Sequence, residues 1–382
     1  MIFEAKTLGD SAVRVVVEGS TISEVSAIDT TDLSSLPTIA PGLIDLQVNG
    51  YGGVDFNSLP LHQADLSHAT ELMHKNGVTG YYPTIITNSD ENISELIVEI
   101  NRLKNSDVNL SNTLMGYHLE GPFISPKDGP RGAHSKQFVR APEAALVKKW
   151  HELSEGQLKI LTLSPEWQEG LEETVAYCVK NNIKVSIGHS AATPEQIQRV
   201  TQLGATMSTH LGNGCDLQIH RHHNYIWQQL AEDNLWSAII ADGFHLPPAV
   251  LKVILRAKQD KVILTSDTTA FGGMAAGRYQ THIGGEVVLT EAGKLHLASN
   301  DELLAGSAQS VLECVNYLIQ SDLLSAEEAW SKASYSPASF MGLHYQGAIK
   351  AGNRADLVLL DTNNNQLTVM NTILAGDSVY SI

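Results

Sequence analysis

The sequence predicts an α/β protein, a (β/α)8 barrel of the TIM type with a small β-sandwich domain formed by both chain termini. Three observations support this fold. The chain has 382 residues, more than a single minimal domain needs. Eight short apolar runs, each followed by a longer helix-like stretch, occupy residues 44–270, at about 28 residues per unit. Runs typical of β-strands lie at both ends of the chain.

The composition is that of a soluble globular protein and limits its partners. Hydrophobic residues make up 43% of the chain and charged residues 18%, which is enough apolar material for a core. The formal net charge is 25 − 42 = −17, which argues against general binding to nucleic acid or anionic lipid. No apolar run reaches the roughly 18 residues that span a bilayer. We therefore expect a small-molecule substrate, no nucleic acid and no membrane.

The first residues and the cysteines favour a cytoplasmic location. Glu4 stands where a secretory signal peptide would carry basic residues, and no long apolar stretch follows it. The three cysteines, Cys178, Cys215 and Cys314, include no C-x-x-C pair. They therefore suggest neither a disulfide framework nor a thiolate zinc site.

The two ends of the chain are predicted to form one domain. Val13–Gly19 and Thr21–Val25 are β-branched runs separated by a Gly-Ser turn, a pattern typical of a hairpin. Asp356–Leu360 and Val379–Tyr380 show the same alternation at the other end. Because neither end makes a sensible domain alone, we expect residues 1–40 and 346–382 to pair in the small β-sandwich.

Residues 41–345 are predicted to form the barrel. Its eight strands are expected at the apolar runs Ile44–Val48, Gly80–Ile86, Leu114–Leu119, Leu158–Leu163, Lys184–Ile187, Ala205–Thr209, Trp236–Ala241 and Val262–Thr265. Amphipathic stretches between them predict helices, such as Pro194–Leu203 after Thr193 and Leu171–Asn181. This alternation favours parallel strands.

A glycine-rich stretch after the eighth run predicts an insertion. Residues 271–285 are a candidate lid, and Glu286–Leu297 reads as two strands around a turn at Glu291-Ala292-Gly293. We therefore expect a β-hairpin near residues 278–298. Helical periodicity resumes over about residues 308–334.

Ionisable side chains follow four of the predicted strands. The third run is followed by Glu120, the fifth by His189, the sixth by His210 and the eighth by Asp267. The carboxyl ends of the strands meet at the barrel face that holds active sites in this fold. One carboxylate and two neutral imidazoles suit zinc or ferrous iron and leave a coordination position for water. We predict that Glu120, His189 and His210 hold one divalent metal and that Asp267 handles protons.

Each of these residues also has a simpler interpretation. Glu120 can accept hydrogen bonds at a strand end, and His189 and His210 can be satisfied polar residues near a core. Asp267 can be the N-cap of a helix. Four such coincidences at four strand ends favour the metal site, provided that the predicted register of the barrel is right.

The motifs resemble those of a known family. Pro41-Gly42-Leu43-Ile44-Asp45 followed by Gln47 and Asn49 is similar to the first-strand signature of the amidohydrolase superfamily, P-G-x-I-D-x-H-x-H, with both histidines replaced. The resemblance implies that one metal of the superfamily's two-metal site is missing or weak. Further motifs are similar to those of the N-acetylglucosamine-6-phosphate deacetylases: His118-Leu119-Glu120-Gly121-Pro122, Gly188-His189-Ser190, Thr209-His210-Leu211, Ala241-Asp242-Gly243-Phe244-His245, Ser266-Asp267 and the closing stretch 347–358.

Carried over residue by residue, the resemblance implies the same roles as the chemistry above. Glu120, His189 and His210 are the implied metal ligands, and Asp267 is the implied general acid and base. His134 and His245 fall where the family has substrate-contacting histidines, with His134 near the acetamide. Zinc is the expected metal, with iron or manganese as alternatives.

The loop at residues 212–224 departs from the family pattern. Asn213 and Gly214 occupy the position whose backbone donors hold the sugar phosphate in the family, and Arg221 aligns with an arginine that reaches this phosphate from a neighbouring subunit. The chain reads His220-Arg221-His222-His223 there. The resemblance implies a homodimer. A histidine-rich loop that binds a second metal, or that only lies on the surface, is the alternative.

The expected reaction is hydrolysis of the acetamide of N-acetylglucosamine-6-phosphate to glucosamine-6-phosphate and acetate. Asp267 would take the proton of the attacking water and return it to the amine, and His134 would stabilise the oxyanion. Alternative substrates are N-acetylgalactosamine-6-phosphate, another N-acetylated amino sugar or an N-acyl amino acid. A non-catalytic assembly protein is a further alternative. A dinucleotide-dependent enzyme is disfavoured, because no G-x-G-x-x-G turn follows the first strand.

Overall fold

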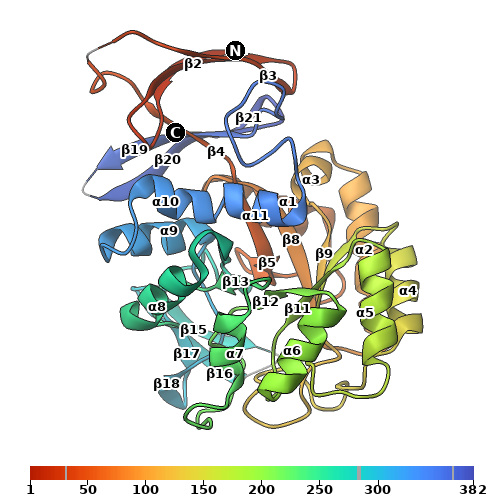
Figure 1. The fold of residues 1–382 in the computed structure, drawn as a ribbon. Coiled ribbons are helices and arrows are strands. Elements are labelled where there is room, and N and C mark those ends of the chain that lie inside the picture. The colour runs from red at the N-terminus through yellow and green to blue at the C-terminus, as the bar shows by residue number, and fades with distance from the viewer. Residues whose placement is uncertain (31, 282–284, 364) are drawn as a thin grey trace.

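Strands from both ends of the chain form one seven-stranded sheet in the computed structural model, which describes residues 1–30, 32–281, 285–363 and 365–382. The strand order is β21-β20-β19-β4-β1-β2-β3. The strands are β1 (Ile2–Lys6), β2 (Ala12–Glu18), β3 (Thr21–Ala27), β4 (Thr38–Pro41), β19 (Leu357–Asn363), β20 (Gln366–Leu374) and β21 (Asp377–Ser381). β4 pairs antiparallel with β19, which joins the two ends of the chain. Figure 1 shows this sheet at the top of the molecule, with both termini.

The terminal sheet encloses a small core of its own. The β2–β3 turn meets the β20–β21 turn so closely that a Cβ on Gly376 would lie 2.0 Å from the Gly19 carbonyl oxygen. The sheet therefore folds over on itself, as the layered packing expected of a sandwich requires. Its enclosed apolar residues are Ala5, Val15, Val17, Ile22, Ile39, Ala355, Leu357 and Ile373.

Eight parallel strands form the barrel in the order β14-β13-β12-β11-β10-β9-β8-β5. The predicted barrel is confirmed. The strands are β5 (Leu43–Val48), β8 (Val78–Ile86), β9 (Tyr117–Glu120), β10 (Leu158–Leu163), β11 (Lys184–Ile187), β12 (Ala205–Ser208), β13 (Trp236–Ile239) and β14 (Val262–Leu264). A small hairpin of β6 (Gly50–Tyr51) and β7 (Val54–Asp55) follows β5. Because β4 continues almost directly into β5, the terminal sheet lies at the amino ends of the barrel strands.

Side-chain and backbone hydrogen bonds close the barrel between β5 and β14. The buried Asp45 carboxylate accepts the Thr265 hydroxyl at 2.8 Å and the Ser266 N–H at 3.2 Å. Beyond β5, the Asn49 N–H donates to the Thr268 carbonyl oxygen at 2.8 Å. The seam is thus built from polar groups just below the barrel mouth.

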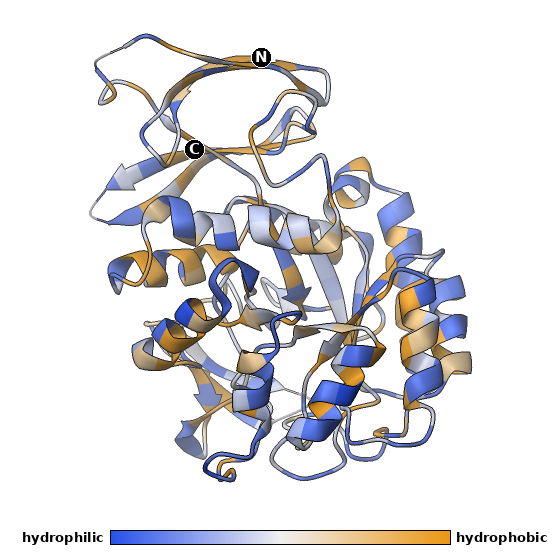
Figure 2. Ribbon diagram, viewed as in Figure 1, coloured by the Kyte–Doolittle hydropathy of each residue, from blue (hydrophilic) through white to orange (hydrophobic). Residues whose placement is uncertain are grey.

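Helices cover the outside of the barrel. They are α1 (Gln63–His74), α2 (Asp90–Asn105), α3 (Val108–Thr113), α4 (Ala144–Leu153), α5 (Leu171–Lys180), α6 (Pro194–Leu203), α7 (Tyr225–Ala231), α8 (Pro248–Lys258), the 3-10 turn η1 (Gln259–Lys261), α9 (Val311–Gln320), α10 (Ala326–Lys332) and α11 (Tyr335–Met341). α6 begins as predicted, since Thr193 and Gln196 form a capping box and Pro194 occupies the first turn. Figure 2 shows hydrophilic and hydrophobic stripes on α5 and α6, as expected of helices that cover a core.

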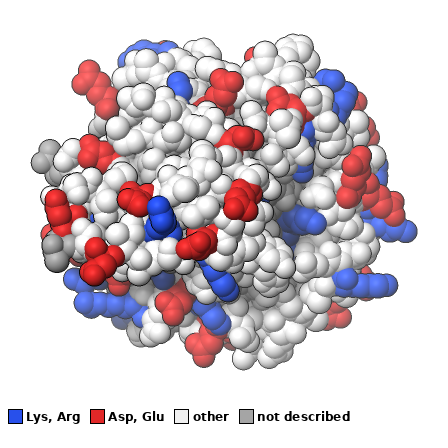
Figure 3. All heavy atoms as spheres, turned by 90° about the horizontal axis from the view of Figure 1, so that it is seen from above, with Lys and Arg blue, Asp and Glu red and all other residues white. Residues whose placement is uncertain are grey.

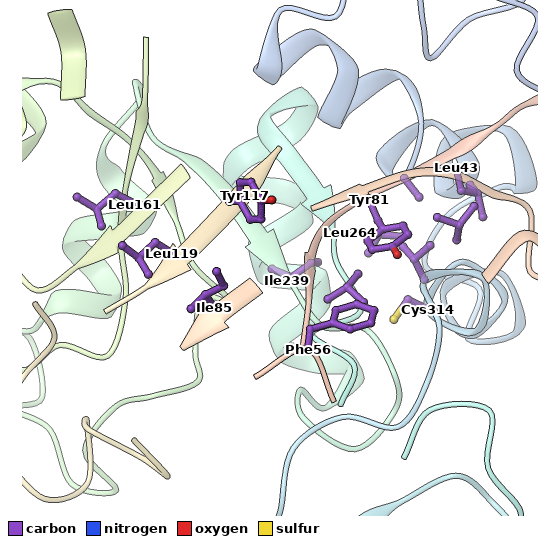
Figure 4. Packing of buried hydrophobic residues seen from close by; sticks show 14 of the residues in the cluster. Leu43, Phe56, Tyr81, Ile85, Tyr117, Leu119, Leu161, Ile239, Leu264 and Cys314 are labelled. Atoms are coloured by element: carbon purple, nitrogen blue, oxygen red, sulfur yellow. The ribbon is translucent and has the colours of Figure 1, made fainter. Parts of the chain in front are cut away.

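The main core lies between the strands and these helices. Figure 4 shows Leu43, Phe56, Tyr81 and Leu264 around the β5 and β8 side, and the Phe56 and Tyr81 rings stack with centroids 6.0 Å apart. Apolar residues of β19 and β20, including Val358 and Val369, belong to the same cluster. The terminal sheet is therefore packed on the barrel and is not a loose appendage.

A four-stranded antiparallel sheet is inserted after β14. It comprises β15 (Gly277–Thr281), β16 (Gly285–Leu289), β17 (Leu295–Leu297) and β18 (Asn300–Leu304). The two strands predicted at 286–297 are present, but two more flank them. Figure 1 shows this sheet at the end of the barrel opposite the terminal sheet. Residues 282–284 of the predicted lid lie outside the described residues.

The surface carries mixed charges. On the face viewed from above in Figure 3, acidic and basic side chains are interspersed, and the described part of that face has no continuous basic area. Within the described ranges, no helix combines the length and apolar character needed to cross a membrane.

Candidate metal centre and active site

Four predicted residues meet at the carboxyl ends of the barrel strands. Glu120 is the last residue of β9, His189 and His210 each lie two residues beyond β11 and β12, and Asp267 lies three beyond β14. All four line one cavity of about 1200 Å³. His134 and His245 line the same cavity. The strand-end reasoning therefore located the mouth of the barrel correctly.

Three of these residues have unusual backbone conformations. His189, His210 and Asp267 have positive φ angles of 50°, 29° and 48°. Non-glycine residues rarely adopt this region, and where they do the surrounding structure must hold them there. The turns after β11, β12 and β14 are thus shaped to aim a side chain into the cavity.

The three predicted ligands lie at mutual distances that suit a metal ion. His210 Nε2 is 3.0 Å and His189 Nε2 is 3.3 Å from Glu120 Oε1. The two Nε2 atoms are 3.2 Å apart. Ligand atoms about 2.0 to 2.1 Å from a tetrahedral zinc ion lie about 3.3 Å from one another. These side chains therefore fit one cation with little rearrangement.

Hydrogen bonding fixes the tautomer of His189. Its Nδ1 lies 2.8 Å from the Pro130 carbonyl oxygen, which can only accept a hydrogen bond. The Nδ1 atom therefore carries the proton, and the Nε2 lone pair points into the ligand cluster. A backbone carbonyl behind a histidine is a typical support for a metal ligand.

The charges in the cluster favour an ionised Glu120. Burial alone would raise its pKa, but hydrogen bonds and charge from His189 and His210 outweigh burial and hold that pKa well below its usual range. Burial likewise acts to lower the pKa of His210, but Glu120 raises it overall. The carboxylate thus favours positive charge at this point, which a divalent cation bound there would supply in place of a proton.

Asp267 lies opposite as a carboxylate with a raised proton affinity. Enclosure in the barrel mouth, reinforced by the charge of Glu120, raises its pKa to about 6. Asn49 Nδ2 donates to its Oδ1 at 2.8 Å. The N-cap interpretation of Asp267 is wrong, because the next regular element after β14 is the strand β15. The carboxylate therefore caps no helix.

His134 belongs to the same cluster more closely than the sequence suggested. Its Nε2 lies 3.2 Å from His189 Nε2 and 4.0 Å from Glu120 Oε2, and its Nδ1 lies 3.0 Å from the Thr87 hydroxyl. Ligand atoms of Glu120, His134 and His189 all lie within 4.8 Å of one another. Burial lowers the pKa of His134 to about 3, so its ring is neutral. His134 therefore lies close to the place where Glu120, His189 and His210 would hold an ion.

The other cavity residues surround this cluster. His245 Nδ1 lies 2.7 Å from Asp242 Oδ2, which orients the ring. Asn213 Nδ2 donates to the His210 carbonyl oxygen at 3.2 Å. Gly214 has a φ of +56°, and a Cβ there would lie 2.7 Å from His189 Nδ1. Only glycine lets this loop approach the histidine so closely.

Arg221 is the one predicted site residue that does not line the cavity of this chain. It is exposed in the loop before α7. In that loop His223 Nε2 lies 2.8 Å from Glu195 Oε1, and His220 Nδ1 accepts the His222 and His223 N–H groups. The residues that the structure describes form no three-ligand cluster there. A second metal in this loop therefore has no support.

Sequence reasoning missed what Gln47 and Asn49 do. Both were interpreted as lost ligands of a second metal. Gln47 Nε2 donates to Glu120 Oε1 at 2.9 Å, just as Asn49 donates to Asp267. Their spacing of two residues at the end of β5 was the available signal, because residues two apart in a strand point to the same face.

Comparison with known proteins gives matches over most of this chain. The family model described as "Amidohydrolase family" matches residues 38–380. An N-acetylglucosamine-6-phosphate deacetylase of Danio rerio is 32% identical over 356 residues, covering 90% of this chain and 84% of that protein. An N-acetylgalactosamine-6-phosphate deacetylase of Escherichia coli O157:H7 is 29% identical over 334 residues, covering 85% and 84%. The crystal structure of the N-acetylglucosamine-6-phosphate deacetylase of Thermotoga maritima has a TM-score of 0.85 and 28% identity, covering 100% of both chains.

Proposed function

Because this chain belongs to the amidohydrolase family, we propose that it hydrolyses the acetamide of N-acetylglucosamine-6-phosphate to glucosamine-6-phosphate and acetate, in amino-sugar catabolism. The observation that carries the proposal is the convergence of Glu120, His189, His210 and Asp267 on one cavity. A non-catalytic assembly protein would have no need for this set of side chains.

Glu120, His189 and His210 are the proposed metal ligands. Their mutual distances suit one divalent cation, and zinc is the first candidate, with iron or manganese as alternatives. A divalent cation held there supplies a Lewis acid toward water and the acetyl carbonyl. His134 lies beside the cluster as a neutral ring and is proposed to contact the acetamide oxygen.

Asp267 is the proposed general base and then general acid. It takes one proton from the water whose oxygen bonds to the acetyl carbon. When the C–N bond breaks, the electron pair stays on nitrogen, and Asp267 gives this nitrogen the proton. Its pKa of about 6 lets the carboxylate both accept and release a proton near neutral pH.

His245 and the Asn213-Gly214 loop are proposed to hold the sugar phosphate. His245, oriented by Asp242, and the Asn213-Gly214 loop lie beside the metal ligands. A charged sugar phosphate does not cross a bilayer unaided, so we propose the cytoplasm as the compartment. The loop at residues 212–224 leaves N-acetylgalactosamine-6-phosphate as the second candidate, which the Escherichia coli O157:H7 relative supports.

A homodimer is proposed to complete the phosphate site. Leu217, Ile219 and Trp227 are 97%, 42% and 53% exposed in and beside the Arg221 loop. Exposed apolar side chains that lie together mark interaction surfaces. Guanidinium groups bind phosphate in a bidentate manner. We propose that a second copy covers this surface and that the partner subunit's Arg221 reaches the substrate.

The test is acetate release combined with metal analysis. Wild-type protein should release acetate from N-acetylglucosamine-6-phosphate and contain one divalent metal ion per chain. The variant Asp267→Asn should retain the metal but lose about 10² to 10⁴ in kcat. The variant Glu120→Ala should lose the metal.

Three results would count against the proposal. Near-normal turnover of Asp267→Asn would remove that residue from proton transfer. Unchanged metal content in Glu120→Ala would remove Glu120 from the ligand set. Faster turnover of N-acetylgalactosamine-6-phosphate by wild type would make that epimer the proposed substrate instead.

A further inference from the structure

Asn49 makes an incomplete set of hydrogen bonds at the edge of the cavity. Its Nδ2 donates to Asp267 Oδ1 at 2.8 Å. Its Oδ1 is buried and has no hydrogen-bond partner among the residues that the structure describes. A carbonyl oxygen that has lost water without gaining a donor is unfavourable, so such atoms in native sites commonly await a ligand.

The position of Asn49 is fixed by its backbone. The Asn49 N–H donates to the Thr268 carbonyl oxygen at 2.8 Å, one residue beyond Asp267. The side chain and the main chain of Asn49 therefore both hold the turn that carries Asp267. The assignment of the amide nitrogen follows from chemistry, because an ionised carboxylate can only accept a hydrogen bond.

Asn49 also determines which oxygen of Asp267 is available. The bond from Asn49 is the one hydrogen bond to the Asp267 carboxylate found in the described part of the chain, and it engages Oδ1. The Oδ2 atom is thereby left for the proton that moves between water and the leaving nitrogen.

We propose that Asn49 is a positioning residue that holds Asp267 with its Nδ2 and receives the N–H of the scissile amide with its Oδ1. This inference rests on the proposed function. The nitrogen that takes a proton from Asp267 Oδ2 must lie within hydrogen-bond distance of it, and Asn49, which contacts the same carboxylate, lines the same cavity. The amide N–H is the nearest donor that an N-acetylated amino sugar offers there.

The proton balance of the step is unchanged by this role. Water adds its oxygen to the acetyl carbon and gives one proton to Asp267 Oδ2. The C–N electron pair goes to nitrogen, which takes that proton and keeps its original hydrogen on Asn49 Oδ1. The released amine therefore carries both of its hydrogens. The acetyl group leaves as acetic acid, which holds the water oxygen and the second water proton and ionises to acetate.

Gln47, two residues before Asn49, contacts a different part of the site. Gln47 donates to Glu120, a proposed metal ligand, so its loss should change metal binding. Asn49 touches the proton-transfer residue, so its loss should change kcat at constant metal content.

The test compares Asn49→Ala with a matched control, Asn57→Ala. Asn57 lines the same cavity, but its amide is satisfied by backbone groups of β8, since Nδ2 donates to the Thr84 carbonyl oxygen and Oδ1 accepts the Ile86 N–H. We expect Asn49→Ala to lose about 100-fold in kcat with KM, metal content and Tm near wild type. We expect Asn57→Ala to lower Tm and to keep kcat within about threefold.

A second substrate separates the proposed role from a structural one. The 2-O-acetyl ester of glucose-6-phosphate has no N–H, and its alcohol leaves with less need of a proton. The loss in Asn49→Ala should therefore be at least about tenfold smaller on this ester than on the amide. A kcat within threefold of wild type on the amide, a loss that follows the metal content, or an equal loss on ester and amide would each overturn the inference. An inactive wild type would instead refute the proposed function.

Discussion

Two single residues fix the orientation of the His189 ring, one by a hydrogen bond and the other by close packing. The Pro130 carbonyl oxygen accepts its Nδ1 proton, and Gly214 lies directly against the same edge of the ring. A histidine binds a metal ion well only when neighbouring groups fix the orientation of its ring. Gly214 is therefore a support of the metal centre, although it offers no ligand atom.

We predict that Gly214→Ala weakens metal binding. The added Cβ would lie 2.7 Å from His189 Nδ1, so the ring must move away from the ligand cluster. The metal dissociation constant should rise by about 10-fold to 100-fold. Titration of the metal-free protein with zinc, followed by calorimetry, measures this change.

Gly19→Ala is the control for backbone strain. Gly19 has the same φ of +56°, but an added Cβ there meets nothing within 4 Å. Both variants should lose about 1 to 2 kcal/mol from the left-handed backbone, and only Gly214→Ala should lose metal affinity. Equal metal affinities in the two variants would contradict the proposed steric cause.

Among the elements, β5 and β14 form the seam on which the site depends. Asp45 of β5 accepts hydrogen bonds from Thr265 and Ser266, which lead directly to Asp267. Burial raises the pKa of Asp45. The folded protein therefore binds this proton more tightly than the unfolded chain does.

This proton affinity predicts a pH-dependent effect of Asp45→Asn. A raised folded-state pKa lowers stability at high pH, and the loss disappears as the pH falls through that pKa toward the ordinary value of 3.8. Asparagine does not titrate. The Tm of wild type relative to Asp45→Asn should therefore increase as the pH is lowered from neutral toward 3.8. A Tm difference that is constant or falls over this range would contradict the assignment.

The elements show which parts of the fold a sequence can predict. β10 and β11 occupy the predicted residues because their apolar runs are buried on both faces. The strands β15 (Gly-Arg-Tyr-Gln-Thr) and β18 (Asn-Asp-Glu-Leu-Leu) were missed, because their side chains are mostly polar and partly or fully exposed. Exposed strands at the edge of a sheet leave no apolar pattern to detect.

The candidate site also has a part that the sequence predicts and a part that it does not. Glu120, His189, His210 and Asp267 were predictable because each follows a recognisable strand, and strand ends converge in a barrel. The hydrogen bonds of Gln47 and Asn49 were not, because they depend on how β5 is aligned with β9 and β14. That register is decided by packing across the barrel and not by local sequence.

For the whole molecule, the proposed dimer predicts complementation between two inactive variants. The Arg221→Ala subunit cannot supply an arginine to the active site of its partner. The Asp267→Asn subunit lacks the proton-transfer residue in its own active site. In a mixed dimer, the Arg221→Ala subunit has its own Asp267 and receives the partner subunit's Arg221. Random mixing should restore about one quarter of wild-type activity.

The measurement is acetate release after the two proteins are unfolded and refolded together. Each variant refolded alone is the control and should stay inactive. Mixing without any gain in activity would show that Arg221 acts within its own subunit or not at all.

The pairing of β4 with β19 has a consequence for how the protein is made. β4 finds its antiparallel partner β19 only at Leu357–Asn363, more than 300 residues further along the chain. A nascent chain on the ribosome therefore holds β1–β4 without β19–β21 until residues 357–381 have been synthesised. Since domains otherwise fold as they emerge, the barrel can assemble before the terminal sheet, which is completed only after β21 has emerged.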